Sequence, residues 1–309
     1  DLSPTLKLKA NVRFEQNTMD YEGTSEGLNE NWEKVVLPPV TFKVEHSMLG
    51  YRGSIHYLKD EFTSFYGSVS QGYKSGGVNQ QPYLSDASRP FDPEFIQNFE
   101  VGFKHLTNDY RSQLTAFYGN RTDQQVSVSS QQVDGDPNSF LYYTGNAGSG
   151  TIQGFEWEHK YKLSQSIHLN ASLGYLETWV DKFVYYAAEG IESFGGERSA
   201  ATSPKISGSL GLKYENGSGL LATANMSYKD EYYFSDSHDE KSEPYSLLNL
   251  TVGKTFRKVT ATFWIRNILD ELYATRGFYF GLIPPDYPDQ LWKSYGDPRQ
   301  AGVTMDYNF

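Results

Sequence analysis

The alternation of apolar and polar residues constrains the fold of this chain more than any other feature. In the last nine residues, every second position is apolar or aromatic, at Ala301, Val303, Met305, Tyr307 and Phe309. Successive side chains of a β-strand point to opposite faces, so this alternation predicts a strand with one apolar and one polar face. Chain ends usually lose such a pattern. Here it continues to the last residue, so we expect the terminal strand to belong to the fold.

The same alternation recurs along the chain, in ranges such as 6–15, 167–175, 206–214 and 220–228, and no segment has a convincing helical period. About twelve strands are predicted. The links between them alternate strictly between short turns and long loops, and the long loops are roughly 16–47, 74–93, 129–150, 176–203, 229–244 and 274–298. In an up-and-down arrangement, all short turns lie at one end of the strands and all long loops at the other. That asymmetry is typical of outer-membrane barrels. We therefore predict an all-β, antiparallel, up-and-down transmembrane β-barrel.

Hydropathy by itself does not separate a soluble β protein from a membrane barrel. Hydrophobic residues make up 38% of the chain and its mean hydropathy is −0.59, but alternation hides the apolar face of a barrel from such averages. Aromatic residues prefer the level of the lipid headgroups. They occur near both ends of the predicted strands, at Tyr57, Phe65, Tyr161, Tyr214 and Phe309 on the short-turn side and Phe14, Tyr73, Tyr175 and Tyr228 toward the long loops. A soluble β-sandwich with tyrosines at its edges is the alternative.

Charge and composition exclude several classes of function. The net charge of −11 argues against a nucleic-acid partner, which needs a basic surface. The chain has no cysteine, so it has no disulfide, thiol nucleophile or thiolate metal site. Residues 252–255 end like a phosphate-binding loop, but Leu248 stands where that loop requires glycine. We predict that the chain is not an enzyme.

Residues 134–145 begin like a calcium-binding loop but lack two of the residues that such a loop requires. Asp134, Asp136 and Asn138 have the spacing of the first ligands, but Ser139 replaces the turn glycine and Gly145 the bidentate glutamate. A solvated acidic loop is the prediction there. The six histidines show no pair with the spacing of metal ligands, so we predict neither a metal site nor a cofactor.

Five segments resemble motifs of the TonB-dependent outer-membrane receptor family and follow the family's order. They are SFYGSVSQGYKSGGVN (64–79), FDPEFIQNFEVGFKH (91–105), NAGSGTIQGFEWE (146–158), WIRNILDELYA (264–274) and GDPRQAGVTMDYNF (296–309). The resemblance implies a 22-stranded barrel that surrounds an N-terminal plug domain and is preceded by a TonB box. The chain matches about the last twelve strands. We therefore expect residues 1–309 to be the C-terminal portion of the barrel domain, with plug and TonB box outside this sequence.

A shorter barrel that closes on its own twelve strands is the alternative to a portion of a larger one. The strand count is even, as closure requires. Half of a larger barrel, however, would leave two sheet edges open in lipid, where unpaired backbone groups are costly. We therefore expect the chain to be a portion of a larger barrel.

The C-terminal strand also resembles that of bacterial outer-membrane proteins, which typically end in an aromatic residue, usually phenylalanine. The barrel-assembly machinery is understood to read this strand. The resemblance therefore implies an assembly signal at Val303, Met305, Tyr307 and Phe309. It also implies that the protein lies in the outer membrane of a Gram-negative bacterium, in contact with lipid and lipopolysaccharide.

The implied function is active uptake of a scarce nutrient, energised by the TonB complex through the plug. A ferric siderophore is the first expectation for the extracellular ligand. A carbohydrate, a cobalamin-like ligand and a passive or structural barrel are the alternatives. Aromatic faces beside cations suit bulky, partly anionic ligands. The candidate ligand-binding residues in the long loops are Tyr142, Tyr143, Tyr185, Tyr186, Arg198, Tyr232, Tyr233, Arg276, Phe278 and Tyr279, with Lys293 nearby. The alternative is that these rings pack against each other.

The polar faces of the strands are predicted to line the barrel interior. The charged or amide candidates are Glu94, Asn98, Glu100, Lys104, Glu156, Glu158, Lys160 and Lys213. In a wide barrel such groups line water or contact a plug, and a single one seldom specifies a ligand.

Overall fold

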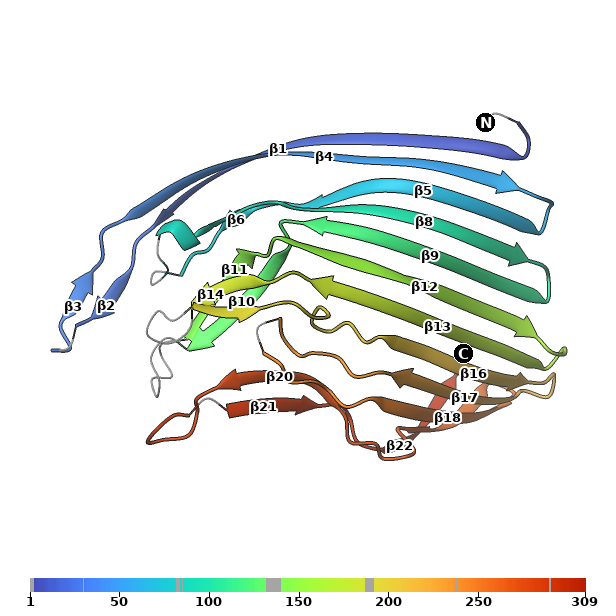
Figure 1. Cartoon of the computed structure of the whole chain (residues 1–309). Helices are drawn as coiled ribbons and strands as arrows, with labels where there is room; N and C mark the ends of the chain where they lie inside the picture. Colours follow the sequence, from blue (N-terminus) through green and yellow to red (C-terminus); the bar gives the residue numbers. More distant parts are fainter. Residues whose placement is uncertain are drawn as a thin grey trace.

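Twelve strands form one antiparallel sheet in which neighbours along the chain are neighbours in space (Figure 1). The computed structural model describes all residues except 1–2, 30, 82–83, 85, 132–139, 187–191, 237 and 289. In sheet order the strands are β1 (Leu6–Gly23), β4 (Val40–Leu58), β5 (Thr63–Lys74), β8 (Glu94–Leu106), β9 (Tyr110–Thr122), β12 (Ser149–Lys162), β13 (Ile167–Val180), β16 (Ile206–Glu215), β17 (Leu220–Lys229), β18 (Tyr245–Phe256), β19 (Val259–Arg266) and β22 (Gln300–Tyr307). The predicted up-and-down, all-β fold is confirmed.

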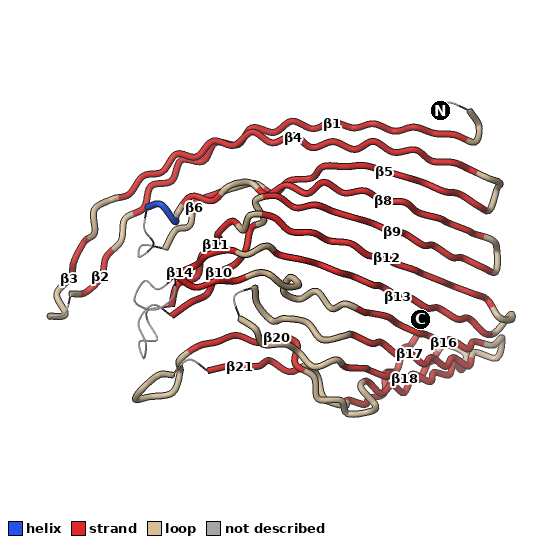
Figure 2. The backbone as a smooth tube through the Cα atoms, viewed as in Figure 1, coloured by secondary structure: helices blue, strands red, loops and turns tan. Residues whose placement is uncertain are grey.

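The short turns and the long links lie at opposite ends of the curved sheet (Figure 2). The long links carry a 3₁₀ turn, η1 (Asp86–Ser88), and five two-stranded hairpins: β2 (Glu26–Leu28) with β3 (Lys34–Val36), β6 (Gly77–Val78) with β7 (Pro90–Phe91), β10 (Gln125–Gln131) with β11 (Phe140–Asn146), β14 (Phe183–Tyr186) with β15 (Glu192–Gly195), and β20 (Ala274–Phe280) with β21 (Gln290–Tyr295). Across the described parts of the chain, no helix is long and apolar enough to cross a membrane. The predicted asymmetry of the links is therefore present.

The first long link is shorter than the sequence predicts. β1 and β4 stay paired from Leu6 opposite Tyr57 to Gly23 opposite Val40, so the link spans 24–39 and not 16–47. The sequence did not indicate this extension, because charged residues follow the apolar stripe there. Lys43 of β4 lies opposite Asp20 and its Nζ is 2.6 Å from Glu45, so the outer part of the hairpin carries ion pairs on an exposed ribbon. Such residues are depleted in strands on propensity, but paired opposite charges stabilise a hairpin.

One face of the sheet is apolar and yet exposed. In β16, Leu210 lies opposite Met226 of β17 and is 53% exposed, and Met305 of β22 is 74% exposed. Phe263 of β19, opposite Val303, is also exposed. A contiguous apolar surface of this extent marks contact with another apolar phase. Buried apolar residues gather instead below the long links, where Val126, Val128, Ala147, Val180 and Phe183 form a small cluster.

Side-chain caps close the short turns. Asp60 Oδ1 accepts a hydrogen bond of 2.9 Å from the Phe62 backbone N–H, and this bond lowers the pKa of the Asp60 carboxyl. Asn216 Oδ1 accepts from the backbone N–H groups of Ser218 and Leu220, both at 3.1 Å. Gly219 follows with a φ of +80°, a conformation that favours glycine. These local hydrogen bonds satisfy the backbone N–H groups of the turns, so that a few residues are enough to connect the strands.

Candidate ligand-binding site

A hollow of about 530 Å³ lies among the long links. It is lined by residues of four of the long links, which the topology brings to one end of the sheet. The lining residues are Asn79, Gln81, Ser127, Val128, Tyr142, Tyr143, Thr144, Ala201, Phe234, Ser235 and Asp236. Two of the predicted aromatic residues, Tyr142 and Tyr143, therefore lie together at a concave site.

Asn79 fixes β11 at the edge of this hollow. Its Nδ2 donates a hydrogen bond of 2.8 Å to the Thr144 carbonyl, and its Oδ1 accepts one of 2.9 Å from the Thr144 N–H. Gln81 Nε2 donates to the carbonyl of Tyr142. The Gln81 Oε1 atom is buried and has no hydrogen-bond partner among the described residues.

Tyr142 and Tyr143 differ in their surroundings. The Tyr142 side chain is 46% exposed, whereas Tyr143 packs against the buried cluster under the links. Exposed aromatic rings on a fixed backbone are typical contact points for a bulky ligand. Tyr142 is therefore the better placed of the two to contact a ligand, and Tyr143 supports it.

Arg198 is held by protein groups. Its guanidinium lies 4.3 Å from the centre of the Tyr233 ring, and its Nη1 forms an ion pair with Asp239. Its Nη2 donates to the Ser235 carbonyl at 2.9 Å, and the side chain is 11% exposed. Lys241 Nζ lies 4.6 Å from the same ring, and its bond to Glu231 raises the pKa of the lysine. Arg198 thus joins two links and shapes the wall beside Asp236.

Tyr232 and Tyr279 join the 230–244 link to β20. The buried Tyr232 hydroxyl donates to the Thr275 carbonyl at 3.2 Å, and burial raises the pKa of the phenol. Tyr279 donates its hydroxyl to Glu240, and its ring centre is 4.7 Å from that of His238. These contacts are the loop-on-loop packing that the sequence left open as the alternative to ligand binding.

The remaining candidates divide into exposed groups and groups that are not described. Phe278 and Arg276 are exposed on β20, and Lys293 Nζ is 5.9 Å from the centre of the Phe234 ring. The backbones of Tyr185 and Tyr186 pair with β15, but their side chains lie outside the described residues. The acidic segment with Asp134, Asp136 and Asn138 also lies outside them.

The predicted interior residues share one face of their strands. Glu94, Asn98, Glu100 and Lys104 alternate along β8, and Glu156, Glu158 and Lys160 along β12. Glu94 does more than line the interior, because its Oε1 accepts from Arg121 Nε at 2.8 Å and its Oε2 from the Gln125 N–H at 2.9 Å. This carboxylate ties the wall of the sheet to the base of the β10–β11 hairpin.

Asn79, Gln81 and Arg121 are the site residues that sequence reasoning missed. Their partners lie 65, 61 and 27 residues away, and no short motif signals such pairs. Histidine, aspartate and glutamate side chains form no cluster of three or more suited to a metal ion in the described ranges.

Comparison with known proteins identifies the family. A family model described as the TonB-dependent receptor-like β-barrel matches residues 1–268. The pesticin receptor of Yersinia pestis is 23% identical over 240 residues, which are 77% of this chain and 33% of that receptor. The metal-pseudopaline receptor CntO of Pseudomonas aeruginosa is 21% identical over 304 residues, 96% of this chain and 38% of that receptor. The chain thus spans about a third of the length of these relatives.

Solved structures share the fold. The ferric yersiniabactin uptake receptor FyuA from Yersinia pestis superposes with a TM-score of 0.79 at 17% identity, covering 100% of this chain and 44% of that one. The copper transporter OprC gives a TM-score of 0.73 at 14% identity, with 99% and 46% covered. The family consists of receptors of the Gram-negative outer membrane and not of enzymes, as predicted. The chain belongs to the TonB-dependent receptor β-barrel family.

Proposed function

We propose that this chain is the C-terminal portion of the barrel of a receptor that imports a scarce nutrient, and that its ligand is a ferric siderophore. The observation that carries the proposal is the hollow of about 530 Å³, where links distant in sequence come together beside the exposed ring of Tyr142. The names of the relatives agree with the class, since they are receptors for yersiniabactin, pseudopaline and pesticin.

The open edges of the sheet support a larger barrel. In the described residues, β1 pairs with β4 alone and β22 with β19 alone. Unpaired backbone groups of an edge strand are very costly in hydrocarbon. Further strands therefore complete the wall, and a plug domain inside it transmits energy from the TonB complex. A self-closed barrel would require β1 to pair with β22, and the lack of such a pair among the described residues supports the larger barrel.

The chemistry of the hollow suits a bulky chelate. The Tyr142 ring offers a flat face; Gln81 bonds the Tyr142 backbone, and Asn79 bonds that of Thr144 two residues further along β11. Arg198 already forms an ion pair with Asp239. Among the predicted cations this leaves the exposed Arg276, and Lys293 beside the Phe234 ring, to offset the negative charge of an anionic complex. A carbohydrate, which also stacks on aromatic rings, is the second candidate.

Assembly and location follow from the outer face. Val303, Met305 and Tyr307 are exposed on the outer side of β22, and Phe309 extends beyond its last paired residue. We expect the barrel-assembly machinery to recognise this strand, and the apolar face to contact lipid and lipopolysaccharide in the finished receptor.

The test is a binding titration of the purified receptor with ferric siderophores of the catecholate, hydroxamate and phenolate classes and with oligosaccharides. Replacing Tyr142 with alanine should weaken binding by about 0.5–1.5 kcal/mol, or roughly two- to tenfold, because a stacking ring is lost. The Tyr185→Ala/Tyr186→Ala variant tests the neighbouring link in the same way.

Trp32→Ala is the matched control, because Trp32 is an exposed aromatic residue of a different link. It should leave affinity unchanged, and all variants should insert normally. Equal affinity of wild type and Tyr142→Ala for every ligand would show that these rings pack the links and do not bind the nutrient.

A further inference from the structure

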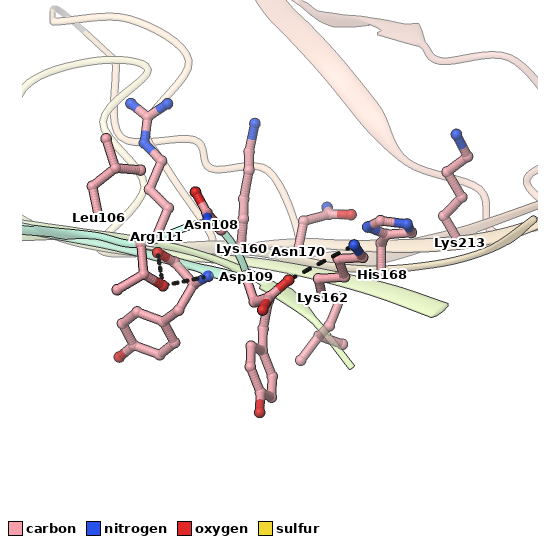
Figure 3. A pocket seen from close by; sticks show the side chains of 13 residues that line it. Leu106, Asn108, Asp109, Arg111, Lys160, Lys162, His168, Asn170 and Lys213 are labelled. Atoms are coloured by element: carbon pink, nitrogen blue, oxygen red, sulfur yellow. Dashed lines mark hydrogen bonds and ion pairs between the residues drawn. The ribbon is translucent and has the colours of Figure 1, made fainter. Parts of the chain in front are cut away.

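A row of basic side chains crosses the inner face of the sheet near the short-turn end. In the strand register, Arg111 of β9 lies directly opposite Lys160 of β12. Lys104 of β8 lies opposite Gln113, two residues from Arg111 along β9. Figure 3 shows Arg111 and Lys160 rising from the same side of the strands. Lys104, Arg111 and Lys160, the basic row, thus place a cation on each of three adjacent strands.

The basic row has no countercharge in the described part of the wall. All three side chains are exposed, and none forms an ion pair with a carboxylate of the described residues. Lys213 of β16, by contrast, has its Nζ 2.5 Å from Glu215. Lys104 Nζ lies 5.7 Å from the centre of the Tyr66 ring, which attracts a cation but does not neutralise it. In a chain of net charge −11, the basic row is therefore a local excess of positive charge.

The basic row borders a hollow of about 470 Å³, which Arg111 and Lys160 line together with Asn170 and Lys213. The interior of a folded protein contains few voids larger than a water molecule. A domain that packs against this face therefore fills the hollow with its own side chains. On packing, the cations lose water, and a buried charge without a partner is costly. A domain that covers this face must therefore bring negative groups to the basic row.

We propose that the basic row is an anchoring surface for carboxylates of the plug domain, whose side chains fill this hollow from inside the barrel. The planar guanidinium of Arg111 presents two parallel donors to a carboxylate, and the Lys160 ammonium adds a point charge beside it. Like charges directly opposite each other destabilise a pair of strands. A carboxylate of the plug between Arg111 and Lys160 removes this repulsion as well as supplying the missing countercharge.

The inner face of β17 and β18 contrasts with the basic row. There Thr223 lies opposite Thr251, and Asn225 lies opposite Asn249. These side chains are uncharged, so packing against them requires no countercharge, and neutral hydrogen bonds are weaker than charge-assisted ones. The plug is therefore held more firmly at β8, β9 and β12 than at β17 and β18.

This inference rests on the proposed function in one respect, because it requires the plug domain that we propose inside this wall. It does not depend on which nutrient the receptor binds. FyuA extends well beyond the compared region, since this chain covers 44% of it. The anchoring surface is tested on the full-length receptor, in which wall and plug are present together.

The first experiment treats the full-length receptor in detergent micelles with a carbodiimide, which joins a lysine amine to a carboxylate in contact with it. Mass spectrometry of the digest should find Lys160 joined to an aspartate or glutamate of the plug. Lys213 should be joined to Glu215, which shows that the reaction has proceeded. Lys254 is the matched control, because it alternates with the exposed Val252 of the outer face and should not be joined to the plug.

The second experiment measures hydrogen exchange of the plug in the Arg111→Gln/Lys160→Gln variant. The plug segment that carries the joined carboxylate should exchange roughly tenfold faster than in wild type, because the charge-assisted contacts that hold it are lost. Thr251→Val removes a neutral group from the inner face of β18 and should leave this rate unchanged. The unheated variant should migrate on a denaturing gel as the wild type does, which shows that its barrel is folded.

Cross-links of Lys104 and Lys160 to carboxylates of the wall alone, or plug exchange at the wild-type rate in the Arg111→Gln/Lys160→Gln variant, would overturn the proposal. The titration with ferric siderophores is run on the same wild-type preparation. A receptor that binds a siderophore but lacks the cross-link to the plug contradicts the anchoring surface alone. A receptor that has the cross-link but binds no siderophore contradicts only the ligand of the proposed function.

Discussion

The two faces of strand β16 differ in a way that a soluble protein would reverse. Leu210 and Leu212 lie on the outer face and are 53% and 45% exposed, whereas Ser209 and Lys213 lie on the inner face. On that inner side the hydroxyls of Ser209 and Ser172 are 2.7 Å apart. A chain in water buries its large apolar residues and exposes its polar ones. The comparison is the one expected of a barrel wall in the outer membrane, with its apolar face outward and its polar face toward the interior.

The largest expected effect comes from placing a charge on each face in turn. Leu210→Arg should cost about 2–4 kcal/mol, because it carries a charge to the midplane of the bilayer. Ser209→Arg, one residue away, should cost much less, because its side chain points into the interior. The free energy of unfolding by urea, measured for both variants in lipid vesicles, tests this difference. Equal losses at the two positions would argue against the barrel.

A smaller loss of stability is expected from a substitution on the inner face, at Glu94. Glu94 is buried, pairs with Arg121 and accepts from the Gln125 N–H. Glu94→Gln removes the charge that Arg121 needs and should lower the free energy of unfolding by about 1–3 kcal/mol. The same unfolding measurement serves here.

The control for Glu94→Gln is Glu158→Gln, an exposed carboxylate of the same face on β12. It should change stability little, since exposed charges contribute little. If both substitutions lower the free energy of unfolding equally little, the contacts of Glu94 with Arg121 and Gln125 do not stabilise the protein.

The smallest effect on stability, but a clear one on biogenesis, is expected at the C-terminus. The Phe309 side chain is 104% exposed and touches its neighbour Tyr307 with ring centres 5.1 Å apart. Deleting it should leave the unfolding free energy of assembled protein nearly unchanged while lowering the yield in the outer membrane. Phe256→Ala, an exposed phenylalanine at the end of β18, is the control and should insert normally. Undiminished insertion of the deleted form would remove the assembly role.

Much of the sheet could be predicted, because alternate residues of a strand lie on opposite faces and therefore differ in polarity. The stripe at 206–214 was assigned to the correct strand, and so was the terminal pattern from 301 to 307, although β22 ends at Tyr307 and not at the last residue. The β1–β4 hairpin was predicted too short, since the ion pairs of its outer part interrupt the apolar stripe. Propensity does not reveal pairing between charged side chains.

The candidate site was less predictable, because its contacts join residues far apart in the chain. The sequence indicated that Tyr232, Tyr279 and Arg198 lie in long links, but not that Tyr232 bonds the backbone of Thr275 or that Arg198 bonds Asp239. Side-chain partners in irregular segments follow no period. The loop-on-loop role of these groups was therefore visible in the structure alone.

The most direct test of the account is a cysteine scan of residues 206–214 in β16. These 309 residues contain no cysteine, so each single substitution adds one labelled position to this part of the receptor. In lipid vesicles, labels at 206, 208, 210, 212 and 214 should be relaxed by oxygen, which concentrates in the bilayer. Labels at 207, 209, 211 and 213 should be relaxed by a water-soluble nickel chelate. This two-residue alternation is the result that the account predicts, and uniform accessibility to the chelate along the strand would contradict it.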